Sequence, residues 1–145
     1  MKTGSAKYLL DTCVLSELVK SMPDTHVLTW FEKRKAHELY LSAMTWAELQ
    51  RGVIRLPESK RRAELTLWLQ QLDDGFENRV LPFDKRSAQE WAHLTVHAEA
   101  QGKPMAAFDS IIAAIARGYG CKLVTRNLRD FADARVELLN PWQDE

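Results

Sequence analysis

The chain has 145 residues, 46% of them hydrophobic, and its 20 Lys and Arg balance 20 Asp and Glu to a formal net charge of zero. This length suits one domain with its own core, and a charged fraction of 28% together with five Trp excludes a disordered chain. The zero net charge also argues against a strongly basic nucleic-acid binder, although it describes the average and not the surface.

Strand and helix signals alternate along the first half of the chain. Residues 7–10 predict a short buried strand, and Asp11 or Thr12, which follow at once, can cap the next helix. The elements expected here are, in order, a strand over 7–10, a helix over 14–20, a helix from 24, a strand over 38–42, a helix that begins near 42–45 and a helix over 58–72.

The second half continues this alternation. It predicts a strand over 79–84 in which Pro82 marks an end or a sheet edge, helices over 85–101 and 107–118, a strand over 121–125 and a fifth strand over 135–139. Strands that alternate with helices indicate an α/β fold with a largely parallel sheet. We interpret residues 1–6 as a polar lead-in, 7–142 as a single domain and 143–145 as a tail.

Hydropathy and cysteine content bear on the cellular compartment. The longest unbroken apolar run, residues 111–116, is far too short to span a bilayer, and no signal peptide opens the sequence. Cys13 and Cys121 are too few for a disulfide framework. We therefore expect a cytoplasmic protein with no membrane partner.

Three acids stand in apolar surroundings. Asp11 follows a predicted strand, Glu48 lies beside Trp46 on a helix, and Asp109 begins the most hydrophobic helix. Each acid also has an ordinary structural explanation when it is taken alone. Asp11 can cap a helix, Glu48 can be a surface residue of an amphipathic helix, and Asp109 can interact with the helix dipole. Two converging carboxylates at about 4 Å repel by about 4 kcal/mol at an effective dielectric of about 20, so either the pKa values rise or a cation neutralises the cluster. Oxygen ligands alone favour Mg²⁺ or Mn²⁺.

Four motifs carry a resemblance to a known family. They are LLDTCVLSE at 9–17, LSAMTWAELQRG at 41–52, FDSIIAA at 108–114 and VTRNLRDF at 124–131. In this order and spacing the chain resembles the PIN-domain ribonucleases, in particular the VapC-like toxins of bacterial type II toxin–antitoxin pairs. The resemblance covers nearly the whole chain. It implies a PIN-like three-layer α/β/α fold with a largely parallel central sheet of four to five strands.

The resemblance also implies a catalytic, metal-binding set of acids. The family's first Asp corresponds to Asp11, its helix Glu to Glu48 and its third acid to Asp109. Where the family often places a fourth Asp directly after Thr-Arg, this chain has Asn127. We therefore assign the fourth acidic role to Asp130, one helical turn onward, with Asn127 as a neutral ligand or positioning group.

Residues next to these acids have expected supporting roles. Thr12 is expected to bond a carboxylate or the phosphate, and Thr125 to orient Asp11 or a metal-bound water, with plain capping as the alternative for both. Cys13 stands where the family usually has Asn or Ser, which leaves the polar contact of that position open.

Basic residues near the acids are candidate RNA contacts. Arg126 and Arg129 flank the expected site, and Arg51 begins a basic excess over residues 51–62. Such patches can follow a phosphate backbone even on a neutral protein, although solvated charges or an antitoxin-docking surface explain them equally well.

This constellation suits metal-assisted hydrolysis of RNA phosphodiester bonds with Mg²⁺ or Mn²⁺. By resemblance, we expect an endoribonuclease toxin that inhibits translation, with a cognate antitoxin, a homodimer that assembles further with that antitoxin, and structured RNA such as tRNA as substrate.

Two other classes of function stay open. An inactive PIN-like interaction module would keep a partner but cleave no RNA, and Asn127 and Cys13 favour it. A phosphoaspartyl α/β domain would use Asp11 as its nucleophile, although the common phosphatase pattern needs an Asp at position 13. A stable phosphate on Asp11, or the absence of metal-dependent cleavage, separates these classes from a nuclease.

Overall fold

Five short parallel strands form one sheet at the centre of the fold. They are Tyr8–Leu10 (β1), Leu39–Ser42 (β2), Val80–Leu81 (β3), Lys122–Val124 (β4) and Leu138–Leu139 (β5). Their spatial order is β3-β2-β1-β4-β5. The structure is a computed structural model that describes residues 6–143. Because β1 is the middle strand and pairs with β2 and β4, the residue that follows it reaches the middle of the sheet edge.

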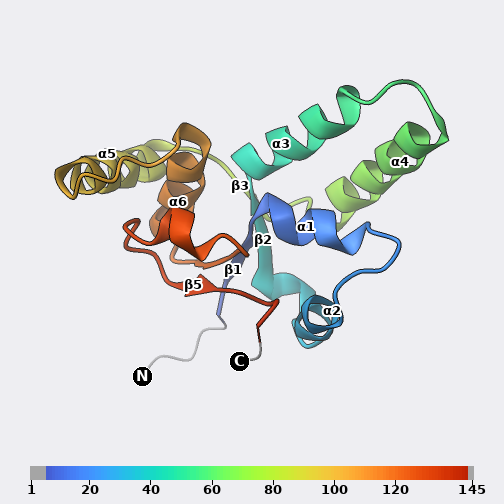
Figure 1. Cartoon of the computed structure of the whole chain (residues 1–145), viewed down its shortest axis with the longest axis horizontal. Helices are drawn as coiled ribbons and strands as arrows, with labels where there is room; N and C mark the ends of the chain where they lie inside the picture. The colour runs from blue at the N-terminus through green and yellow to red at the C-terminus, as the bar shows by residue number, and fades with distance from the viewer. Residues whose placement is uncertain (1–5, 144–145) are drawn as a thin grey trace.

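Helices cover both faces of the sheet (Figure 1). Within residues 6–143 they are Thr12–Leu18 (α1), Thr25–Glu32 (α2), Ala43–Ile54 (α3), Lys60–Gly75 (α4), Lys85–Ala100 (α5) and Ala107–Tyr119 (α6), with short 3₁₀ turns at Ala36–Glu38 (η1) and Leu128–Phe131 (η2). In Figure 1, α1 to α4 lie on one side of the sheet, and α5 and α6 lie on the other.

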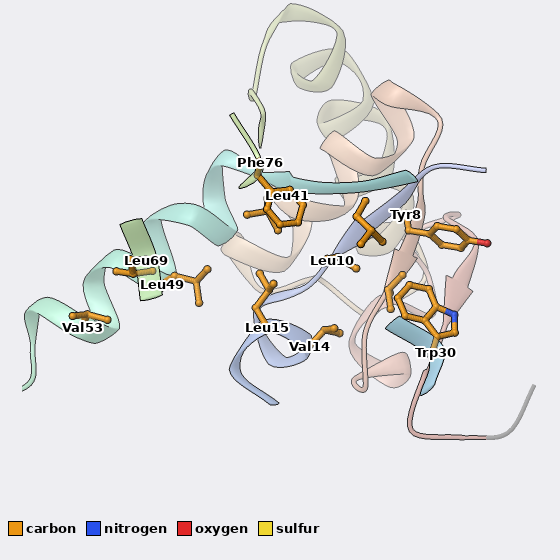
Figure 2. Close-up of a cluster of buried hydrophobic side chains, with 12 residues drawn as sticks. Tyr8, Leu10, Val14, Leu15, Trp30, Leu41, Leu49, Val53, Leu69 and Phe76 are labelled. Atoms are coloured by element: carbon orange, nitrogen blue, oxygen red, sulfur yellow. The ribbon is translucent and has the colours of Figure 1, made fainter. Parts of the chain in front are cut away.

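The core consists of two clusters, one on each face of the sheet. Successive side chains of a strand point to opposite faces, so Tyr8 and Leu10 pack with the α1–α4 layer while Leu9 packs with α5 and α6. Figure 2 shows the first cluster, in which Leu10 and Leu41 of the sheet lie among side chains of the covering helices. The middle strand is therefore buried from both sides, as a parallel sheet requires.

The predicted α/β fold with a largely parallel sheet is confirmed, and the differences are at element ends. The first helix begins at Thr12 and not at 14, because the Asp11 side chain caps it directly. The strand expected over 79–84 is only Val80–Leu81 at the sheet edge, since Pro82 has no N–H to donate. The fifth strand is likewise short, at Leu138–Leu139.

No helix within residues 6–143 is long and apolar enough to cross a membrane. Of the expected lead-in and tail, residues 1–5 and 144–145 lie outside the described residues.

Candidate active site

Asp11 stands at the carboxyl edge of the sheet, directly after β1. Its side chain is 6% exposed. Oδ1 accepts the backbone N–H of Thr12 at 2.8 Å, which caps α1, and Oδ2 accepts the hydroxyl of Thr125 at 2.8 Å. Thr125 is fully buried at the end of β4, the neighbouring strand. Each oxygen of Asp11 therefore has a fixed partner and keeps lone-pair capacity for a ligand.

Glu48 reaches the same edge from α3. Ser42, the last residue of β2, accepts the N–H of Thr45 at 2.9 Å and so begins this helix immediately after its strand. One turn further on, Glu48 is half-buried and its Oε1 accepts the Thr12 hydroxyl at 2.6 Å. An O–H···O distance this short is typical of an ionised acceptor. Because Thr12 donates its only hydroxyl proton to Glu48, that proton is not available to a phosphate.

Asp109 lies in the first turn of α6 and is half-buried. Burial, as the largest cause, and the negative charges of Asp11, Asp130 and Glu48, in that order, together raise its pKa to about 6. A carboxylate is disfavoured both by desolvation and by nearby like charges. The four predicted acids therefore share one electrostatic field, although they come from four different segments of the chain.

Asp130 is exposed and lies on η2, the turn that follows β4. With Asp109 and Asp133 it lines a pocket of about 190 Å³ that Lys103 and Arg129 also line. The position after Thr125-Arg126 is instead occupied by the exposed Asn127, whose backbone N–H donates to the Thr125 hydroxyl at 3.0 Å. The structure thus brings Asp130, and not position 127, to the pocket that contains Asp109.

Cys13 lies between the two strand ends. Its thiol is 3.7 Å from both Asp11 Oδ2 and Thr125 Oγ1, and it accepts the backbone N–H of Arg126 at 3.5 Å. Burial raises the pKa of this thiol above its ordinary value of 9.0, and the neighbouring Asp11 raises it further. Cys13 is therefore a neutral contact between the first strand and the loop after β4, and not a reactive thiolate.

The three arginines that we singled out from the sequence are all exposed. Arg126 lies over the ring of Trp142 with its guanidinium carbon 5.0 Å from the ring centroid. Arg129 borders the pocket with Asp109. Arg51 lies on α3, three residues after Glu48, where helical spacing places the two on neighbouring parts of the surface.

Two pocket residues, Asp133 and Lys103, were missed in the sequence. Asp133 follows Asp130 by three residues, which is one turn of a 3₁₀ helix, so the acid repeat was the available signal. Lys103 is in a loop and offered no periodic signal. Lys103 lines the pocket only because the loop between α5 and α6 packs near η2 in the folded chain.

The donor set bears on which metal the site suits. Among residues 6–143, no group of three or more His, Cys, Asp or Glu side chains is arranged to hold a metal ion. The predicted acids nevertheless present only oxygen donors, and their mutual repulsion is the kind that a cation relieves. Donor type and charge therefore fit a hard divalent cation, and they do not suggest zinc or copper.

Comparison with known proteins places the fold in a family. Residues 8–137, most of the chain, match the family model described as the PIN domain. The chain belongs to the PIN domain family. Over 139 residues this PIN domain is 38% identical to VapC ribonuclease Y4jK of Sinorhizobium fredii, which covers 93% of this chain and 97% of that protein.

Chains in two solved structures share this fold. A structure of FitAB bound to an IR36 DNA fragment contains a chain that superposes with a TM-score of 0.91 and 36% identity, covering 95% of this chain and 97% of that one. A member of the VapBC family of toxin–antitoxin systems, VapBC-5 from Mycobacterium tuberculosis, gives a TM-score of 0.70 at 26% identity and covers 94% and 99%. The family resemblance of the four motifs is thereby confirmed.

Proposed function

We propose that this PIN domain is a metal-dependent endoribonuclease that acts as the toxin of a toxin–antitoxin pair. The observation that carries the proposal is the shared field of Asp11, Glu48, Asp109 and Asp130, which together with burial raises the pKa of Asp109 to about 6. An acid with a strongly raised pKa, close to other acids at the carboxyl edge of a parallel sheet, is typical of a catalytic site. The ribonuclease name of a relative that is 38% identical supports the same chemistry.

Mg²⁺ or Mn²⁺ is the cofactor that we assign to this site. Asp11 and Asp109 are the residues that would bind it directly, and Glu48 and Asp130 would bind it through water or help to deprotonate that water. A divalent cation in this position would neutralise charge on the scissile phosphate and acidify a bound water.

The chain's own residues orient the acids and accept a proton. The Thr12 N–H and the Thr125 hydroxyl hold the two oxygens of Asp11 in place. Glu48 is the acid that we assign to receive the proton of the attacking water, since its ionised carboxylate is oriented by Thr12. The water oxygen then forms a bond to phosphorus, the bond to the leaving ribose oxygen breaks, and that oxygen takes up a proton from solvent.

RNA is the substrate that we infer, with structured RNA such as tRNA as the first candidate. Arg126, Arg129 and Arg51 are exposed, and we assign them to the phosphates on either side of the scissile bond. Phosphate contacts position a strand without reading its sequence, so the choice of target depends on RNA shape.

An antitoxin and a second copy of the chain are the protein partners that we infer. Support comes from the similarity to a chain of a VapBC toxin–antitoxin system and to a chain of the DNA-bound FitAB complex. We propose that the antitoxin blocks or disorders the acidic edge, and that the homodimer assembles further with it.

The deciding experiment compares the cleavage of structured RNA by wild type and by Asp109→Asn, with Mg²⁺ and with EDTA. We expect the substitution to reduce the rate at least 100-fold and EDTA to abolish wild-type cleavage, since the transition-state charge is then unneutralised. Asp74→Asn, which removes an exposed acid from α4, is the matched control and should leave cleavage unchanged.

If wild type and Asp109→Asn cleave RNA at equal rates and EDTA does not affect either rate, the proposed mechanism is wrong. A folded, antitoxin-binding protein without any cleavage, in which Asp11→Ala has no effect on growth, would point to an interaction module. Trapping of a stable phosphoryl group on Asp11 would point to the phosphoaspartyl class.

A further inference from the structure

Exposed apolar side chains are concentrated on α5 and in the segments that flank it. Of the described residues, seven large hydrophobic side chains are exposed, and four of them lie between residues 83 and 108, namely Phe83, Trp91, Val96 and Phe108. The other three are spread over residues 22–67. Single exposed apolar residues are ordinary, whereas a concentration of them marks an interaction surface. α5 is therefore a candidate surface for a protein partner.

α5 has a buried face and an exposed face. Ser87, Leu94 and Ala98 are buried, on the side where α6 packs. The other side, which we call the exposed α5 face, extends from the first turn of the helix to the last and consists of Lys85, Ala88, Ala92, Val96 and Glu99. Figure 1 shows α5 at the outer edge of the molecule. Within the described part of the chain, this face is exposed along its whole length.

The residues of the exposed α5 face are spaced symmetrically about Ala92. From Lys85 to Glu99 the successive steps are three, four, four and three residues. Two copies of α5 packed antiparallel about a two-fold axis at Ala92 therefore place Ala88 opposite Val96 of the second copy. An interface between identical chains related by a two-fold axis is self-complementary in this way. The short Ala side chains at the centre allow the two helices to approach closely.

The charges at the two ends of this face fit the same arrangement. Lys85 lies in the first turn and Glu99 in the last turn, each seven residues from Ala92. In an antiparallel pair, Lys85 faces Glu99 of the second copy, and this pairing occurs twice. Within residues 6–143 neither side chain forms an ion pair. A parallel pair would bring like charges together, so charge complementarity selects the antiparallel one.

We propose that two copies of this chain associate through their exposed α5 faces, packed antiparallel about Ala92. The proposal rests on the proposed function in one respect, since it names the surface of the homodimer inferred there. Trp91, beside this face, donates its indole N–H to the Ser110 hydroxyl at 2.9 Å, in the turn of α6 that carries Asp109. A second copy on α5 therefore lies near one of the assigned catalytic acids.

The test is sedimentation velocity on the full chain in the absence of RNA and antitoxin. Wild type is expected to form a reversible dimer. Val96→Glu places a charge opposite Ala88 of the second copy and should raise the Kd of the dimer about 50-fold or more, because the charge is buried without a partner. Leu67→Glu is the matched control, since it puts the same charge on an exposed apolar position of α4 and should leave the Kd unchanged.

Charge reversal tests the antiparallel pairing separately. Lys85→Glu and Glu99→Lys each bring like charges together at both ends of the interface, so each should raise the Kd about ten-fold at low salt. Both substitutions suit the helix dipole, so a weaker dimer would not reflect a less stable helix. The double variant with both reversals restores opposite charges and should return the Kd to within about three-fold of wild type.

A monomeric wild type would overturn the proposal, as would a dimer that Leu67→Glu disrupts and Val96→Glu does not. A double variant that associates no better than the two single variants would also contradict it. Because the measurement contains no RNA, any of these results leaves the nuclease assignment to be decided by the cleavage assay.

Discussion

At the scale of single residues, Asp11 and Glu48 are held in place by hydroxyl groups and not by opposite charges. Thr125 fixes Asp11 across a separation of 114 residues, and Thr12 fixes Glu48 across 36. A neutral hydroxyl orients a carboxylate without cancelling its charge, so the negative field of the site survives. Glu17 shows the contrast, because this buried acid is paired with Lys20 at 2.8 Å and also accepts the N–H of Asp24.

Asp109 should destabilise the metal-free protein at neutral pH. Its pKa is about 6 in the fold against an ordinary value of 3.8. Because the folded state binds this proton more tightly, the stabilising contribution of Asp109 is complete below pH 3.8 and is lost as the pH rises through 6. In EDTA, Asp109→Asn should therefore be more stable than wild type at pH 7 by about 1 kcal/mol, a figure reduced for partial exposure.

Urea unfolding at pH 7 and at pH 4 measures this difference. The gain in the free energy of unfolding should shrink toward zero at pH 4, where the wild-type carboxyl group is protonated as well. A gain that is the same at both pH values would show that Asp109 does not experience the field of the other acids.

At the scale of elements, the position of Asp109 depends on close packing between α5 and α6. Gly118 is the point of contact, since an added Cβ would lie 2.9 Å from the Cγ of Arg86 and 3.3 Å from the Cα of Ser87. The same helix ends are tied by the Tyr119 hydroxyl, which donates to the Asp84 carboxylate that caps α5. This hydrogen bond lowers the pKa of Asp84 and raises that of Tyr119.

Two glycine substitutions should have opposite effects on stability. Gly118→Ala places its Cβ against the backbone of Ser87, so we expect the overpacking to cost about 1–3 kcal/mol. Gly52→Ala, in the exposed part of α3, meets no atom within 4 Å and should stabilise the protein by up to about 1 kcal/mol through helix propensity. Chemical denaturation of both variants measures the difference. A gain in stability for Gly118→Ala would show that α5 and α6 can move apart at no cost.

At the scale of the whole molecule, the net charge is zero although acidic and basic side chains are unevenly distributed. The acids gather at one edge of the sheet, and the exposed Arg129 lines the pocket that contains Asp109 and Asp130. The formal sum therefore says little about RNA binding, because a phosphate backbone meets the local surface and not the average.

RNA binding should be weakly dependent on salt and involve few phosphates. Arg126→Gln is expected to raise the KM for RNA about three- to ten-fold with little change in kcat, since it removes a positioning contact. It should also reduce the slope of log affinity against log salt by about 0.7–0.9. Glu48→Gln should have the opposite effect and lower kcat with little change in KM. If Arg126→Gln keeps the wild-type slope of log affinity against log salt, Arg126 does not contact an RNA phosphate.

The sequence by itself determined the alternation of strands and helices, because each apolar segment carries its own period and cap. It also singled out Asp11, Glu48 and Asp109, not through any one acid but through the order and spacing of the motifs that contain them. Its errors were confined to element ends, where a cap such as Asp11 or a Pro such as Pro82 decides the last hydrogen bond.

Only the tertiary structure decided which groups meet. The bonds from Thr125 to Asp11 and from Thr12 to Glu48, and the pocket that joins Asp109 to Asp130, unite residues from distant parts of the chain. Sequence spacing carries no information about such contacts until parallel strands bring their carboxyl ends to one edge. The same holds for the exposed α5 face, which is set apart only once the other face of that helix has packed against α6.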